Sequence, residues 1–157
     1  MRARPWLVGV QLGLLAIAAA AEAAPTQDEV IARRELVTAS FQWLEATLAR
    51  DFAVQSTFYP ERMPVFYLWR DVPQAAVMAE KRRVFEQAGT IDIRIDPPQL
   101  LVDSGGRSGR MYFRKTYVIE GKVNRTGTVL QELRWAKQGD RWKIVSERDL
   151  RVIRDPR

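Results

Sequence analysis

The sequence predicts an α+β fold in which a cone-like, curved antiparallel sheet wraps around an N-terminal helix and two further helices. Three observations predict it. A capped helical segment comes first, two shorter helical segments flank an aromatic strand, and the last third of the chain reads as long strands with apolar side chains on one face. The length of 157 residues suits a single domain.

The first helix is predicted over residues 27–49. Thr26 and Glu29 have the spacing of a capping box, in which each side chain accepts a hydrogen bond from the backbone of the other residue. Apolar residues at helical spacing predict its buried face: Val30, Val37, Phe41, Leu44 and Leu48. Asp51 can then cap a short second helix over 52–57.

An aromatic strand and a third helix follow. Residues 63–69 are apolar and too few for a helix, which favours a strand. Asp71 is a candidate cap for the next helix, with Pro73 in its first turn. Its predicted inner side consists of Val72, Ala76, Ala79 and Phe85. The basic run 81–83 reads as a solvated helix face.

The remaining strands are predicted to pair as antiparallel neighbours through short turns. Four strands are expected. The first covers 91–95 and resumes over 100–103 after a bulge or bend at Pro97 and Pro98, and the others cover 110–120, 126–137 and 141–152. One face collects the apolar side chains: Ile91, Ile93, Ile95, Met111, Phe113, Ile119, Val129, Leu133, Trp135, Trp142 and Ile144. The other face mixes opposite charges, so the apolar face is expected to meet the helices.

The N-terminus has the pattern of a secretory signal peptide over residues 1–23. Arg2 and Arg4 precede an apolar run, and Ala21 to Ala23 fit a small-residue cleavage site. The alternative is an uncleaved N-terminal anchor. With cleavage, residues 24–157 form one domain without a stable membrane span, and we expect a periplasmic or secreted protein.

Composition excludes several kinds of chemistry. The chain contains no cysteine and no histidine, so disulfides, zinc sites and Ser-His-Asp triads are not expected. No oxygen-ligand cluster indicates another metal, and no cofactor is expected. The net charge of +6 could favour anionic envelope partners, or could serve solubility alone. The basic residues are scattered, which argues against nucleic acid.

Polar side chains on the apolar sheet face are the candidate ligand-binding residues. Lys115 and Gln131 sit in mid-strand, where burying a polar group without a partner costs about 1–3 kcal/mol. One interpretation is that Lys115, Tyr117 and Gln131 hold an anionic or amide-bearing ligand. The other is that Lys115 packs its methylenes and extends its ammonium to the mouth of the hollow. Tyr67 and Trp69 could roof that hollow, or act only as core or rim aromatics.

This order of elements resembles the nuclear transport factor 2-like superfamily, which includes SnoaL-like and ketosteroid-isomerase-like proteins, over roughly residues 27–152. The segments that carry the resemblance are 43–45, 50–51, 58–59 and 142–147. A basic Lys-Arg-Arg run at 81–83, the Ile-x-Ile strand at 91–95 and residues 113–117 are similar to the domain appended to some L,D-transpeptidases and other bacterial envelope proteins. The resemblance implies a cone with a hollow that either catalyses acid–base reactions or only binds.

Carboxylates for acid–base catalysis are scarce on the inner sheet face. A ketosteroid-isomerase-like mechanism needs a carboxylate base in the hollow with a tyrosine or a protonated acid opposite. Asp71 reads as a cap, Glu147 falls on the charged face unless a bulge turns it inward, and Glu45 could point either way. We therefore predict no catalytic residues.

The sequence favours a non-catalytic, exported binding or accessory module of the bacterial cell envelope. Its partner could be an envelope protein or peptidoglycan, and a small ligand could occupy the hollow. The outer sheet face could form a homodimer contact through Tyr112, Arg114, Leu130 and Arg134. The alternative function is a small-molecule isomerase, cyclase or hydrolase that acts in the hollow.

Overall fold

The computed structural model describes residues 24–122 and 124–153, so the predicted signal peptide lies outside the described residues. Three helices and seven strands make up the described chain. In order they are α1 (Gln27–Ala49), α2 (Phe52–Ser56), β1 (Arg62–Phe66), β2 (Trp69–Pro73), α3 (Gln74–Glu86), β3 (Ala88–Ile95), β4 (Gln99–Val102), β5 (Ser108–Gly121), β6 (Arg125–Gln138) and β7 (Arg141–Ile153). None of these helices is long and apolar enough to cross a membrane.

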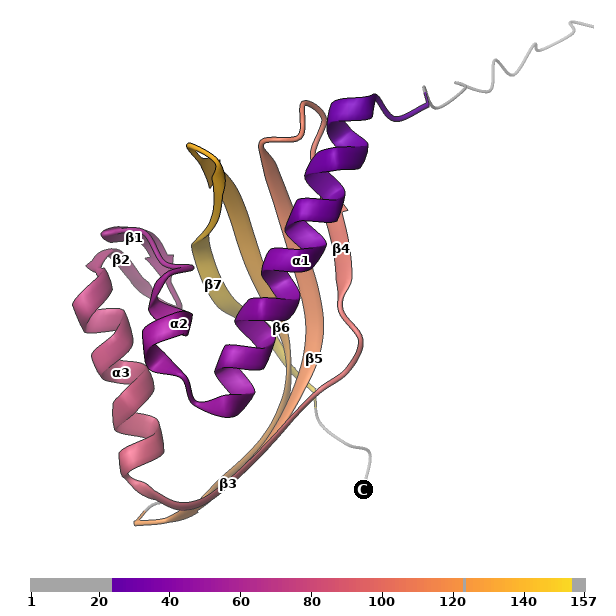
Figure 1. Ribbon diagram of the computed structural model, residues 1–157. Coiled ribbons are helices and arrows are strands. Elements are labelled where there is room, and N and C mark those ends of the chain that lie inside the picture. Colours follow the sequence, from indigo (N-terminus) through magenta and orange to yellow (C-terminus); the bar gives the residue numbers. More distant parts are fainter. Residues whose placement is uncertain (1–23, 123, 154–157) are drawn as a thin grey trace, which may run out of the picture.

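The strands form one curved sheet, and the three helices cover one of its faces (Figure 1). The strand order is β2-β1-β7-β6-β5-β3, and β4 also pairs with β5 beyond the break at Pro97 and Pro98. The α+β cone is confirmed. Most neighbours are antiparallel, but β1 runs parallel to β7, so the sheet is mixed rather than wholly antiparallel.

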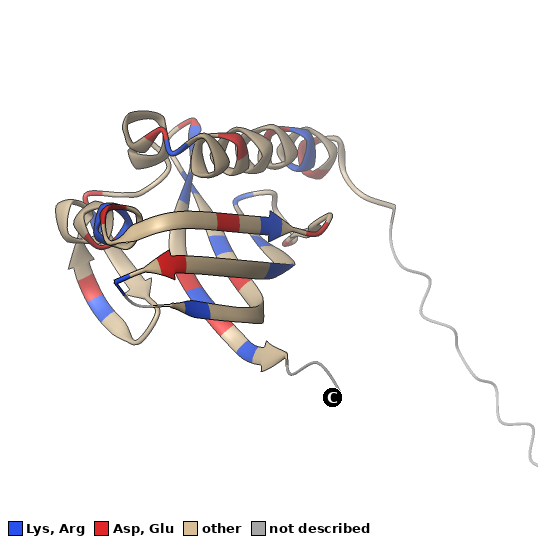
Figure 2. Cartoon of the chain, turned by 90° about the horizontal axis from the view of Figure 1, so that it is seen from below, with Lys and Arg blue, Asp and Glu red and all other residues tan. Residues whose placement is uncertain are grey.

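The predicted inner face of the long strands is the core of the protein. Phe113, Leu133, Trp135 and Ile144 are all buried beneath the helices. Charged residues of both signs occur along the strands (Figure 2), and Arg114 on the outer face is exposed. The alternation of apolar and polar residues therefore gives the correct orientation of β5 and β6.

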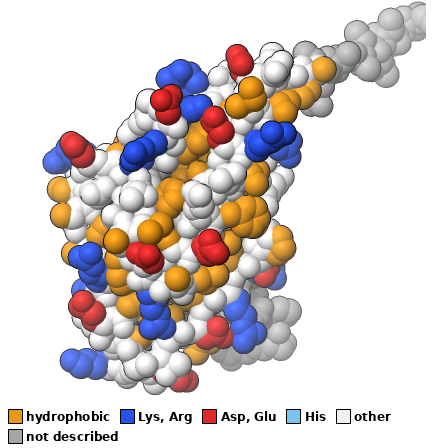
Figure 3. All heavy atoms as spheres, viewed as in Figure 1, with side chains coloured by type: hydrophobic (Ala, Val, Ile, Leu, Met, Phe, Trp, Pro, Cys, Tyr) orange, Lys and Arg blue, Asp and Glu red, His pale blue; other side chains and the backbone are white. Residues whose placement is uncertain are grey.

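Helix α1 has the predicted bounds and capping box, but a different face is buried. The backbone N–H of Glu29 donates to the Thr26 hydroxyl at 3.3 Å, and that of Thr26 to the Glu29 carboxylate at 2.8 Å. The buried residues are Ala32, Leu36, Ser40, Trp43 and Ala46. The predicted stripe is wrong at Val30, Phe41 and Leu48, which are about half exposed, and apolar side chains reach the surface along α1 (Figure 3).

Two glycines contact the buried face of α1. A Cβ added at Gly106 would lie 2.9 Å from the Ala32 side chain, and one at Gly109 would lie 2.5 Å from Leu36. The absence of a side chain at these two positions therefore leaves room for Ala32 and Leu36.

The segment around Asp71 differs from the prediction. Residues 62–73 form a hairpin, β1–β2, and Asp71 lies within its second strand with its carboxylate 2.6 Å from the Arg62 guanidinium. Asp71 is therefore not a helix cap, and α3 begins only at Gln74. The buried side of α3 consists of Val77 and Met78, whereas Ala76 and Ala79 are exposed, and Val72 is buried as part of β2.

One irregularity in β7 turns two carboxylates inward. Ile144 pairs with Trp135 but Ser146 pairs with Arg134, so β7 contains one extra residue between them. Glu147 consequently lies opposite the buried Leu133. The same register places Asp149 opposite Gln131, and a second shift follows only beyond Asp149. The expectation of an inner face without carboxylates is wrong, because the first bulge reverses the alternation that follows it.

Candidate functional site

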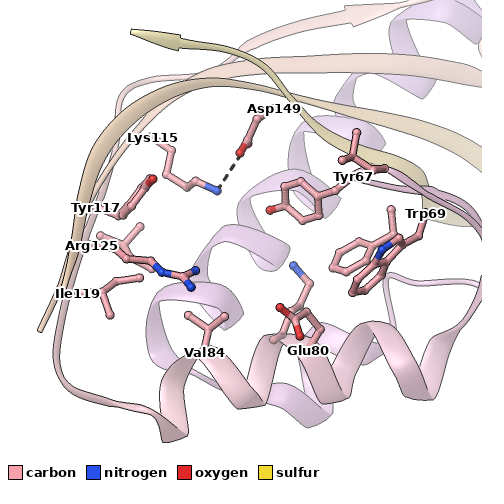
Figure 4. A pocket seen from close by; sticks show the side chains of 13 residues that line it. Tyr67, Trp69, Glu80, Val84, Lys115, Tyr117, Ile119, Arg125 and Asp149 are labelled. Atoms are coloured by element: carbon pink, nitrogen blue, oxygen red, sulfur yellow. Dashed lines mark ion pairs between the residues drawn. The ribbon is translucent and has the colours of Figure 1, made fainter. Parts of the chain in front are cut away.

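A cavity of about 410 Å³ opens between the sheet, helix α3 and the turn that joins β1 to β2 (Figure 4). Its apolar walls are Phe66, Leu68, Trp69, Val84, Ile93 and Ile119. Its polar lining residues are Tyr67, Glu80, Lys81, Lys115, Tyr117, Arg125 and Asp149. The volume is typical of a site for a small organic molecule.

The five candidate residues from the sequence meet at this cavity, although not all of them line it. Tyr67, Trp69, Lys115 and Tyr117 contribute to the lining. Gln131 is buried behind them and donates a hydrogen bond from its Nε2 to the Tyr67 hydroxyl at 3.0 Å. Gln131 therefore orients Tyr67 instead of facing the cavity.

The strand geometry explains how the lining is assembled. On β5, Lys115, Tyr117 and Ile119 alternate with outward residues and so share the inner face. Gly127 lies opposite Tyr117 on β6, and a Cβ there would approach the tyrosine hydroxyl to 2.9 Å. The glycine thus leaves room for the Tyr117 ring to lie across its neighbouring strand.

Behind the cavity, Glu147 is the centre of a buried polar network. Its carboxylate accepts hydrogen bonds from the hydroxyls of Tyr59 at 2.8 Å and Tyr67 at 3.2 Å. The Lys81 ammonium donates to both carboxylate oxygens, at 2.9 and 3.0 Å. Trp43 extends the network, because its indole N–H donates to the Tyr59 hydroxyl at 3.1 Å.

The network fixes the protonation states of its members. Burial opposes ionisation of Glu147, but Lys81 and Lys115 together with the hydrogen bonds hold its pKa below the usual value. Burial, followed by the Glu147 charge, raises the pKa of both Tyr59 and Tyr67 well above the ordinary value. The Tyr67 hydroxyl donates its one proton to Glu147, so that proton is not available to a molecule in the cavity.

Acidification is expected to remove the stabilisation that Glu147 provides. A carboxyl whose pKa is lowered on folding stabilises the protein fully above its unfolded value, here about 4.5, and loses this effect as the pH falls through the folded pKa. As the pH falls below 5, the free energy of unfolding should therefore decrease less for the Glu147→Gln variant than for the wild type. Urea unfolding at a series of pH values measures the two slopes, and equal slopes would contradict the assignment.

Lys115 and Asp149 form a second, looser pair that faces the cavity. The Lys115 ammonium lies 3.9 Å from the Asp149 carboxylate, and within the described ranges it makes no hydrogen bond. Burial lowers the pKa of Lys115, although both nearby carboxylates oppose this effect. Burial also raises the pKa of Asp149; Lys115 opposes the rise and Glu147 adds to it. Asp149 is thus a carboxyl in the cavity that can gain a proton more readily than usual.

Sequence reasoning missed Lys81, Glu147 and Asp149. The two carboxylates depend on the bulge in β7 that precedes Glu147, and no residue type gives a signal for it. Lys81 was predicted to lie on a solvated helix face, and this prediction is wrong because its ammonium pairs with the buried Glu147. Its position was open to prediction, since Val77, Lys81 and Val84 follow at steps of four and three on one helix face. In the part of the chain described here, no three carboxylates gather closely enough to hold a metal ion.

No known family model and no curated protein matches the sequence of this chain. Solved structures do match its fold. A candidate scytalone dehydratase from Novosphingobium aromaticivorans superposes with a TM-score of 0.62 at 9% identity, covering 81% of this chain and 87% of the other. A candidate polyketide cyclase from Xanthomonas campestris pv. campestris gives 0.59 at 11% identity, with 75% and 90% covered.

A third solved structure carries the name of the family. It is a candidate dehydratase of the NTF2-like family from Streptomyces avermitilis, with a TM-score of 0.58 at 13% identity, covering 76% of this chain and 95% of the other. At these identities the similarity concerns the path of the backbone. The order of helices and strands, the curved sheet and these matches agree, and the chain has the nuclear transport factor 2-like fold.

Proposed function

We propose that this chain is an exported, non-catalytic protein that binds a small organic molecule in the cavity. The cavity itself carries the proposal, because apolar walls on α3, β3 and the β1–β2 turn surround a few convergent polar groups. The names of the structural neighbours, a candidate cyclase and two candidate dehydratases, support a role that involves small molecules.

The hydrogen bonds that the polar side chains already make favour binding over catalysis. Glu147 is 2% exposed, is not part of the cavity lining, and already accepts from three donors. It therefore cannot reach a substrate as a base. Tyr67 likewise has no free proton with which to stabilise a developing oxyanion.

A second candidate function, proton-transfer catalysis, rests on Asp149. This carboxyl faces the cavity and has a raised pKa, as a general base or acid requires. The two functions differ in a measurable way, because a base in the cavity would exchange protons next to the carbonyl of a bound ketone. Incubation with ketones in D₂O, followed by NMR, should show no exchange above the level of Asp149→Asn if the protein only binds.

Filling the cavity is expected to abolish binding of a neutral apolar probe. Val84→Trp places an indole on the cavity wall, so the fluorescence enhancement of N-phenyl-1-naphthylamine should fall about tenfold or more. The matched control is Val118→Trp, because Val118 lies on the outer face of β5 and is 39% exposed. Equal probe binding by wild type and Val84→Trp would contradict the proposal.

Export is part of the proposal and depends on residues 1–23. Residues 1–157 can be expressed in a bacterium and the periplasmic fraction analysed by intact mass spectrometry. We expect the mass of a protein that begins at Ala24. A full-length product in the membrane fraction would support the uncleaved anchor instead. A pull-down from envelope extract with the mature protein tests the proposed envelope partner.

A further inference from the structure

We infer that the ligand is an amphipathic anion whose acidic group binds the Lys115 ammonium and whose apolar body lies against the cavity walls. This inference rests on the proposed binding function and adds the chemical class of the ligand. Two observations carry it: an unsatisfied ammonium on the inner face of β5, and an aromatic wall across the cavity from it.

The first observation is the difference between the two lysines of the site. Lys81 is satisfied by Glu147, which it contacts at 2.9 and 3.0 Å, and its ammonium also lies 5.2 Å from the centre of the Tyr59 ring. Lys115 is similarly enclosed, with 19% of its side chain exposed, yet its nearest carboxylate oxygen, on Asp149, is 3.9 Å away. A buried ammonium without a close acceptor is unfavourable, so an acidic group of a ligand would complete its shell.

Figure 4 shows that the Lys115 side chain points into the cavity and toward Asp149. The Arg125 guanidinium projects into the same space from β6, and no ion pair holds it within the described residues. Both cations therefore favour an anion in the cavity, with Lys115 at the deeper position and the exposed Arg125 nearer the solvent.

The second observation is the apolar wall. Trp69 lies across the cavity from Tyr117 and Ile119 (Figure 4), and it is 52% exposed. Leu68, beside it in the turn, is 92% exposed. An aromatic body inserted between this turn and the sheet would bury apolar surface that now faces water, and this burial favours binding.

Asp149 then acts as an internal competitor for Lys115. Its carboxylate is the nearest negative charge to the ammonium, and it would lie close to any acidic group bound there. Glu147 is the other negative charge that faces Lys115, but Lys81 neutralises it. Removing the charge of Asp149 should therefore strengthen anion binding, whereas removing that of Lys115 should weaken it.

The test uses two probes that differ by a single acidic group. 1-Anilinonaphthalene-8-sulfonate is N-phenyl-1-naphthylamine with a sulfonate added. In fluorescence titrations at neutral pH and low salt, Lys115→Met should weaken the sulfonate about tenfold or more and leave the neutral probe within about twofold. Asp149→Asn should tighten the sulfonate about threefold or more.

Two further variants complete the experiment. Lys122→Met removes the same charge from the exposed β5–β6 turn, so it controls for net charge and should change sulfonate binding less than about twofold. Lys115→Gln keeps a polar group if Lys115→Met fails to fold, and it should show the same loss. Circular dichroism and urea unfolding establish that each variant is folded.

The outcomes separate this inference from the proposed function. If Lys115→Met affects both probes equally, or Asp149→Asn weakens the sulfonate, the acidic group does not bind at Lys115 and the inference is overturned while the cavity still binds. If neither probe binds the wild type, or Val84→Trp leaves both unchanged, the proposed binding function fails and the inference fails with it.

Discussion

Replacing Glu147 with Ala is expected to destabilise the protein by about 3–5 kcal/mol, the cost of leaving a buried charge without its partner. The carboxylate is 2% exposed and is shared by Tyr59, Tyr67 and Lys81. Its removal leaves the Lys81 ammonium, with 14% of its side chain exposed, beside two tyrosine hydroxyls that have lost their acceptor. Urea unfolding followed by tryptophan fluorescence measures the change in the free energy of unfolding.

The double variant Lys81→Met/Glu147→Leu tests whether the loss comes from the unpaired charge. Because buried ion pairs offset much of their attraction by desolvation, replacing both partners should recover most of the stability lost in Glu147→Ala. Lys81→Met alone should be intermediate, since it strands the carboxylate but leaves both tyrosine donors in place. A loss below about 1 kcal/mol in Glu147→Ala would show that the network does not hold α3 to the sheet.

The orientation of β5 and β6 was predictable from sequence because no irregularity interrupts their pairing. From Met111 to Ile119 every pair follows in register, so the two-residue period places Phe113 and Leu133 correctly. The same reasoning fails in β7, where one extra residue precedes Glu147. A bulge changes the face of every residue beyond it, and local composition gives no sign of its position.

The helices show a different limit, since two interpretations of one segment were both consistent with local rules. Helix α1 carries two apolar stripes, and the buried one contains Ala32 and Leu36, for which Gly106 and Gly109 leave room. Asp71, Pro73 and Gln74 have the spacing of a helix start, but pairing of Val72 with Met63 extends the hairpin to Pro73, and the helix begins at Gln74. In both cases contacts distant in sequence decide, and a single sequence does not contain that information.

The candidate site follows the same division. Sequence patterns predicted four of the lining residues. Regular strand alternation indicated Lys115 and Tyr117, and aromatic composition indicated Tyr67 and Trp69. The partners that determine their chemistry, Asp149 for Lys115 and Glu147 for Tyr67, come from the irregular strand. The lining was therefore readable from sequence, whereas the proton and charge balance within it was not.

Replacing Trp43 with Ala should also cost about 3–5 kcal/mol, because it opens a large cavity between α1 and the sheet. The indole is 2% exposed and packs on Phe113 with 6.1 Å between ring centroids. It also joins α1 to the network of Glu147, since its N–H donates to the Tyr59 hydroxyl at 3.1 Å. Chemical unfolding measures the total loss in the free energy of unfolding, which combines the packing of the ring with its hydrogen bond.

The pair Trp43→Phe and Trp135→Phe separates packing from hydrogen bonding. Both tryptophans are at most 2% exposed, but the Trp135 N–H has no hydrogen-bond partner among the described residues. Trp135→Phe removes only ring volume and an unsatisfied donor, whereas Trp43→Phe also leaves Tyr59 without a donor. Trp43→Phe should thus be less stable than Trp135→Phe by about 1 kcal/mol or more. If instead the two variants lose equal stability, Trp43 holds α1 by packing alone, and the polar network ends at Tyr59.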